Sequence, residues 1–163
     1  DYTGACTHFE ESLTLFRQTG DKWGMGMPLL NWGYTDSLQG NLDAARDRLE
    51  ESIAMLRQVG ERTARSVTLN ILAHVVQQQG DYEQAAVLYT ESLDLLRKMG
   101  IEASTADVIY NLAYLVHTQG HFPLAAKLYK ESLDLFSRQE NEEGIAKCRT
   151  GLAAVTGVPK EMR

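Results

Sequence analysis

The chain has 163 residues, 44% of them hydrophobic and 23% charged, a composition typical of one folded domain rather than of a disordered tail. Its formal net charge of −6 argues against a nucleic-acid-binding surface, which needs clustered lysine and arginine. No apolar run is long enough to cross a membrane, nothing resembles a signal peptide, and Cys6 and Cys148 lack metal-ligand spacing, so we expect a cytoplasmic protein.

One pattern of residues recurs every forty positions along the chain. It comprises two series of glycines, a Glu-Ser pair and a small residue: Gly20, Gly60 and Gly100; Gly40, Gly80 and Gly120; Ser12, Ser52, Ser92 and Ser132, each preceded by Glu; and Ala5, Ala45, Ala85 and Ala125. Because a glycine falls every twenty residues, each forty-residue unit divides into two segments. Internal repeats with such a period are typical of stacked helical units.

The repeat predicts the organisation of the chain. We expect one solenoid over 1–163, made of a half repeat (1–20), three full repeats (21–60, 61–100 and 101–140), a closing helix (141–157) and a tail (158–163). The sequence starts inside a repeat and with Asp1 rather than Met, so we also expect it to be a piece of a longer protein.

The first full repeat contains a segment that allows two interpretations. "GMG" at 24–26 resembles the start of a dinucleotide-binding loop, but Leu29 replaces the third glycine and no strand precedes the segment. The alternative is a loosened helix start. Pro28 has no backbone N–H, so we expect this helix to begin late or to kink near Pro28.

The second and third full repeats predict helical hairpins. Residues 81–99 carry apolar or small side chains at steps of three and four, Asp81 suits the helix start, and Gly100 suits its end. Residues 101–119 show a second helical stripe that ends at Gly120. No alternating strand pattern occurs, and one hairpin cannot bury its apolar face alone. The sequence therefore predicts an all-α solenoid of stacked antiparallel helical hairpins.

The stretch "YNLAYLVHTQGHFPLAAKLYKESLDL" at 110–135 resembles the tetratricopeptide repeat. Leu112 and Ala113 match the signature of its first helix, Ala125 and Tyr129 match that of its second, and Ser132 stands for the last alanine. The period of forty and the missing closing proline differ from the common form. They look like the repeats of large bacterial signalling regulators, peptide-pheromone receptors and kinesin light chains. The resemblance implies a right-handed superhelix that serves as a non-catalytic scaffold for proteins or peptides.

The resemblance also implies a concave groove lined by the first helix of each repeat. Carried over position by position, the groove residues are Leu30, Tyr34, Asn70, His74, Gln77, Tyr110, Tyr114 and His117. Tyrosine, asparagine and glutamine combine apolar area with hydrogen-bonding tips, which suits a peptide groove. The alternative is structural, because such side chains also bridge neighbouring helices. A clamp for a peptide carboxylate would need lysine or arginine at these positions, and none is present.

The sequence offers no catalytic or metal-binding constellation. His117 and His121 are four apart, but Gly120 should break the helix between them, and the repeated serines are explained by packing. We expect no enzyme activity, no cofactor, no metal, no nucleic acid and no membrane partner. Two functions remain open: a peptide-binding sensor or docking arm of a larger bacterial regulator, and a scaffold that self-associates through exposed terminal hairpin faces.

Overall fold

Eight α-helices joined by short turns account for nearly all of residues 2–157, the part of the chain that the computed structural model describes. The helices are α1 (Tyr2–Thr19), α2 (Lys22–Leu38), α3 (Leu42–Gln58), α4 (Thr63–Gln78), α5 (Tyr82–Met99), α6 (Glu102–Thr118), α7 (Phe122–Arg138) and α8 (Glu142–Thr156). No strand occurs within residues 2–157, which confirms the all-α prediction. The predicted tail at 158–163 lies outside the described residues.

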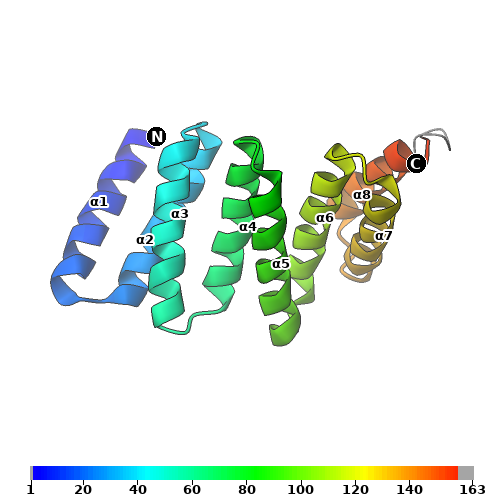
Figure 1. Cartoon of the computed structure of the whole chain (residues 1–163). Coiled ribbons are helices and arrows are strands. Elements are labelled where there is room, and N and C mark those ends of the chain that lie inside the picture. The colour runs from blue at the N-terminus through cyan, green and yellow to red at the C-terminus, as the bar shows by residue number, and fades with distance from the viewer. Residues whose placement is uncertain (1, 158–163) are drawn as a thin grey trace. The chain divides into compact units, whose positions relative to one another are not determined.

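The chain divides into two compact units, Asp1–Ser92 and Leu93–Arg163. In the first unit α1 packs on α2, α2 on α3, and α3 on α4. In the second unit α6 packs on α7, and α7 on α8 (Figure 1). Helices that follow one another in sequence are therefore neighbours in space, as expected for stacked hairpins.

Each helix pair is joined by a turn with the same backbone conformation. Gly80 has φ 89, a region that side chains disfavour, and its N–H donates to the Gln77 carbonyl at 3.0 Å. The Asp81 N–H donates to the Val76 carbonyl at 3.0 Å, so the turn satisfies two carbonyls at the end of α4. The other turn glycines also have positive φ: Gly20, Gly40, Gly60, Gly100 and Gly120. Glu140, with φ 53, takes this place before α8.

Three of the four repeated serines, Ser52, Ser92 and Ser132, join the two helices of a hairpin. Their hydroxyls are buried, and each donates to a backbone carbonyl 26 residues earlier: Ser52 to Gly26 at 2.8 Å, Ser92 to Ser66 at 2.7 Å, and Ser132 to Ala106 at 2.8 Å. The sequence predicted a small residue at this contact. The hydrogen bond is an additional reason for serine, because alanine would be equally small but could not donate.

The glutamates that precede these serines are paired, which the sequence did not predict. Each accepts from an arginine 34 residues earlier: Glu51 from Arg17 at 3.3 Å, Glu91 from Arg57 at 3.3 Å, and Glu131 from Arg97 at 2.7 Å. Exposed pairs of this kind contribute about 0–1 kcal/mol each. The Glu-Ser motif thus combines a weak surface contact with a buried one.

The helix that contains Pro28 does not begin late. α2 begins at Lys22, and the Asp21 carboxylate accepts from the Gly24 N–H at 2.9 Å. A Cβ on Gly24 would lie 2.3 Å from the Phe16 ring, and one on Gly26 would lie 2.8 Å from Leu56. The two glycines therefore serve close helix packing rather than a loosened start, and the helix continues through Pro28.

The first hairpin contains a buried charge that the repeat does not predict. Asp36 is 1% exposed, and its carboxylate accepts from the Arg48 guanidinium and, at 2.5 Å, from the Tyr2 hydroxyl. Arg48 also lies over the Trp32 ring, 3.9 Å from its centroid. A buried carboxylate needs such partners, because desolvation penalises an isolated charge.

Residues 2–157 contain neither a membrane-spanning helix nor a cluster of metal ligands. None of their helices is long and apolar enough to cross a membrane. No group of three or more His, Cys, Asp or Glu side chains comes together there as metal ligands. Cys6 and Cys148 are both free thiols.

The serine hydrogen bond can be tested by a single substitution. We expect Ser132→Ala to lower the free energy of unfolding by about 1 kcal/mol, because it removes the bond to the Ala106 carbonyl. The measurement is urea unfolding followed by circular dichroism. Ser137→Ala, on the exposed side of α7, is the matched control and should change stability by less than about 0.5 kcal/mol. Equal stability of the two variants would show that Ser132 acts by size alone.

Candidate functional site

The predicted groove residues of the first unit lie on α2 and α4 and differ in accessibility. Tyr34 is 47% exposed, whereas Leu30 is 7% exposed and offers little surface to a partner. Asn70 is half-buried on α4. His74 is exposed one turn further on, and partial desolvation lowers the pKa of its imidazole.

Gln77 and His117 hold buried tyrosines of the following helix. The Tyr89 hydroxyl donates to Gln77 Oε1 at 3.1 Å, and Tyr129 Oη shares a hydrogen bond of 3.3 Å with His117 Nδ1. Burial raises the pKa of both tyrosines far above the ordinary value, so both stay protonated near neutral pH. The contact with Tyr89 gives Gln77 a structural role rather than a place in a groove. His117, in addition to its contact with Tyr129, lines a pocket.

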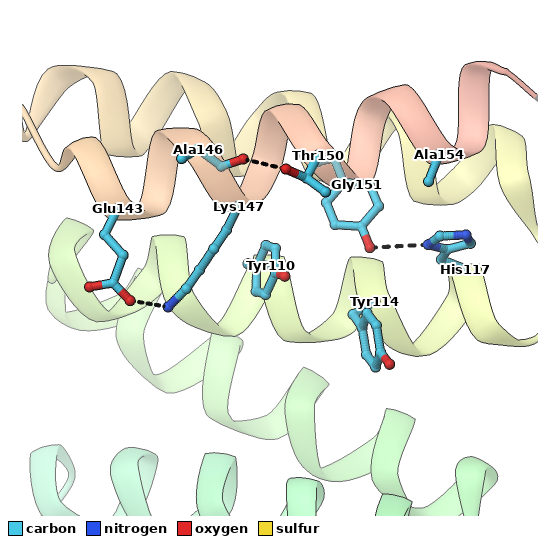
Figure 2. Close-up of a pocket in the computed structure, with 10 residues that line it drawn as sticks. Tyr110, Tyr114, His117, Glu143, Ala146, Lys147, Thr150, Gly151 and Ala154 are labelled. Carbon is cyan, nitrogen blue, oxygen red and sulfur yellow. Dashed lines mark hydrogen bonds and ion pairs between the residues drawn. The ribbon is translucent and has the colours of Figure 1, made fainter.

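In the second unit, three predicted residues come together in one pocket. Tyr110, Tyr114 and His117 of α6 lie opposite α8 (Figure 2). The Tyr129 ring of α7 contacts the Tyr110 and His117 rings of α6 and lies against Gly151 of α8. The pocket has a volume of about 410 Å³, within the usual range of ligand sites. Its lining residues are Tyr110, Tyr114, His117, Tyr129, Glu143, Ala146, Lys147, Thr150, Gly151 and Ala154.

Gly151 makes room for the wall of this pocket. A Cβ at position 151 would lie 2.5 Å from the tip of the Tyr129 ring, closer than atoms in contact can approach. The corresponding residue one repeat earlier is Asn111. Gly151 was not among the residues predicted from the sequence. Its presence inside a helix could have indicated a close contact, because glycine there lowers helix stability unless packing requires it.

Aromatic rings form most of the pocket and contact one another. The Tyr110 and Tyr129 rings lie 5.7 Å apart, and the His117 and Tyr129 rings 6.1 Å apart in an edge-to-face arrangement. Phe122 packs edge-on against His117 at 5.9 Å, so the imidazole is held from two sides. The rings of the pocket wall therefore support one another through contacts within the chain.

The charged residues of the pocket lie on α8 and were also missed. Lys147 Nζ pairs with Glu143 Oε1 at 2.5 Å, one helical turn away. This hydrogen bond lowers the pKa of the Glu143 carboxyl and raises that of the Lys147 ammonium. Both groups stay charged near neutral pH. Thr150 is not an activated hydroxyl, because it donates to the Ala146 carbonyl at 3.0 Å.

The arrangement suits binding rather than catalysis. Among the lining residues, the acid and the base neutralise each other in an exposed i,i+4 pair, and the histidine supports a buried tyrosine. A catalytic site needs a nucleophile held by a base, with groups that stabilise developing charge. The lining instead supplies apolar ring faces, hydroxyl tips and two charged side chains at its edge.

The comparison with protein families gives one match. The family model of the tetratricopeptide repeat matches residues 24–98 and again residues 63–138, together more than half of the chain. This model describes a repeat unit and not a catalytic family. No curated protein matches the sequence.

Solved structures with the same fold include repeat proteins of several kinds. BtubC (BKLC) from P. vanneervenii is 20% identical with a TM-score of 0.75, over 91% of this chain and 65% of that one. A protein from Podosopora anserina with nearly identical TPR-like repeats is 16% identical, with a TM-score of 0.77, over 99% and 82%. The signal transduction ATPase PH0952 from Pyrococcus horikoshii, which has a tetratricopeptide repeat sensor, is 13% identical with a TM-score of 0.79, over 91% and 23%. At these identities the likeness establishes the fold, an all-α solenoid.

The buried tyrosines predict a loss of stability at alkaline pH. Tyr129 stays protonated in the folded chain above pH 10, whereas an unfolded tyrosine ionises near that pH, so stability present below pH 10 is lost as the pH rises. Each such tyrosine adds about 1.4 kcal/mol per pH unit to the loss. We expect Tyr129→Phe to weaken the pH dependence of urea unfolding between about pH 10 and 11.

The matched control for this measurement is Tyr82→Phe, at an exposed tyrosine. Lysine titration contributes equally to both variants, so their difference isolates Tyr129. Identical slopes in the two variants would mean that Tyr129 is not protonated preferentially in the folded state.

Proposed function

Because the chain belongs to the tetratricopeptide repeat family, whose repeats mediate protein–protein interaction, we propose that it is a non-catalytic module that binds a protein or peptide through the pocket between α6 and α8. The observation that carries the proposal is the meeting of Tyr110, Tyr114 and His117 in that pocket. These residues occupy positions that the resemblance to the repeat assigns to its groove, and Tyr114 is 48% exposed.

The chemistry of the pocket supports a peptide ligand. Tyrosine provides a large contact area with few rotatable bonds, so its immobilisation on binding costs little entropy. The hydroxyl of an exposed tyrosine can donate to or accept from a peptide backbone. The wall formed by Tyr129 and His117 is already in place, so a ligand does not have to organise it.

We place the module in a larger cytoplasmic protein, as a sensor or docking arm of a bacterial regulator. The support is the similarity to the repeat sensor of a signal transduction ATPase, of which this chain spans 23%. The net charge of −6 favours a protein partner over a nucleic acid, which would be repelled.

A second candidate function is assembly by self-association through the terminal helices. Leu15 is 63% exposed on α1, the first helix of the first unit. Burial of such a side chain against another copy would be favourable. A single exposed leucine is common on monomeric proteins, so the pocket is the better-supported surface.

Site-specific cross-linking tests the proposed function. A photoreactive benzoylphenylalanine replaces Tyr114 in one variant and Leu124 in another, and each is irradiated in lysate of the source organism. Leu124 is the matched control, because it is similarly exposed on α7 but outside the pocket lining. We expect a partner band from position 114 that is absent from position 124, identified by mass spectrometry.

The partner should depend on the aromatic wall. Adding Tyr110→Ala to the position-114 variant should reduce the band about tenfold, the loss expected for an interface residue worth about 1.4 kcal/mol. Equal cross-linking from both positions would move the binding surface away from the pocket. Cross-links between copies of the chain alone would establish self-association instead.

A further inference from the structure

The negative charge at the pocket exceeds the positive charge there. Asp107 lies on α6 one turn before Tyr110, so the two side chains share a face of that helix. Glu143 and Lys147 face them from α8, and Lys147 interacts electrostatically with both carboxylates. Two carboxylates and one ammonium therefore lie at this end of the pocket, where Glu143 and Lys147 belong to the lining and Asp107 lies beside it, and the ammonium pairs with Glu143.

Asp107 is the carboxylate whose charge is less well compensated. Its pKa is raised by desolvation and further by Glu143, and Lys147 opposes the shift without cancelling it. An additional cation near Asp107 would stabilise its charged form against both the desolvation and the repulsion by Glu143. Asp107 is exposed, so a cation of a partner can reach it from solvent, and the two carboxylates come from two different helices.

The aromatic walls favour the same kind of group. The faces of tyrosine rings are electron-rich and attract cations at distances of up to about 6 Å. A resident cation lies close to these rings: the Lys147 side chain extends from α8 toward α6 beside the Tyr110 ring (Figure 2). Its pKa is raised, mainly by the hydrogen bond to Glu143, and Asp107 and Tyr110 add to the shift. This corner of the pocket therefore stabilises an ammonium group that belongs to the chain itself.

We propose that the pocket between α6 and α8 recognises an arginine side chain of the partner, with its methylene stem on the tyrosine rings and its guanidinium beside Asp107 and Glu143. This inference rests on the proposed function. Arginine fits better than lysine, because its planar group stacks on aromatic rings and offers five N–H donors to the carboxylates. An acidic side chain would be repelled by the net charge, and a purely apolar one would cover part of the exposed Asp107 carboxylate without offering it a partner.

Blocked pentapeptides test the inference directly. The probes are Ac-Gly-Ala-Xaa-Ala-Gly-NH2, with arginine, citrulline, norleucine or glutamate at Xaa, titrated into the 163-residue chain and followed by NMR signals of the pocket residues. Citrulline has nearly the shape of arginine without its charge. We expect the arginine peptide to bind about tenfold more tightly than the citrulline peptide, with a preference that weakens as salt is added.

Two substitutions should change the preference in opposite directions. Asp107→Asn should reduce the advantage of arginine over citrulline to less than about threefold. Lys147→Met should increase it several-fold, because it removes the resident cation and keeps the apolar stem. Asp134→Asn, at an exposed carboxylate of α7 outside the pocket lining, is the matched control and should leave the advantage unchanged.

The inference is overturned if the norleucine or glutamate peptide binds most tightly, if arginine and citrulline bind equally, or if the advantage survives Asp107→Asn. Tight binding of the norleucine peptide in the pocket would still support the proposed function, so the two failures are distinguishable. Absence of any shift at the pocket residues overturns the arginine inference. The proposed function then depends on the cross-linking result at position 114.

Discussion

The close contact between the two helices of a hairpin is the constraint on which the remaining structure depends. In the third hairpin it is made by Ala125 and Ser132 of α7, both without solvent exposure, and Ser132 also bonds to the backbone of α6. A larger side chain at either place would force the helices apart, at a cost of about 1–3 kcal/mol. Because every hairpin must meet this requirement, the same small residues return at the same phase. The forty-residue period of the sequence therefore reflects one way of packing two helices, which is repeated in each hairpin.

The pocket depends on the same contact. Tyr129 lies on α7 between Ala125 and Ser132, and its ring is almost fully buried, so its position is set by the hairpin and not by a ligand. His117 holds the hydroxyl from α6, and Gly151 leaves space for the ring on α8. One wall of the candidate binding pocket is therefore an extension of the core. Its charged edge lies instead on the exposed first turns of α8, where Glu143 and Lys147 are accessible to solvent.

The sequence predicted features that depend on local pattern and failed where a neighbouring helix decides. Glycine spacing located the turns, and helical periodicity located the hairpins. The period also gave the phase of Leu30 and Gln77, but phase does not say what faces a side chain. Leu30 is covered by packing, and Gln77 is engaged by Tyr89. The expected late start near Pro28 was wrong because the Asp21 cap and the close packing of Gly24 and Gly26 hold the first turns of α2. The pairing of Asp36 with an arginine from α3 was not predicted at all. Lys147 and Gly151 matter only because α8 lies opposite α6 and α7.

The alanine and serine positions at the close hairpin contact keep one residue type in every copy, and positions on the candidate binding face do not. The place of Asp107 is occupied by Met27 and Val67 in the earlier repeats and by Lys147 in the last helix. A packing requirement shared by all copies would have kept these residues alike, as it kept the serines. Their divergence means that the hairpin tolerates any of them, so a difference in recognition is free to arise there. The change from apolar to charged side chains occurs on α6 and α8, where the tyrosine-lined pocket lies. The repeats that build the fold therefore resemble one another, while the features that can select a partner lie in their departures from the pattern.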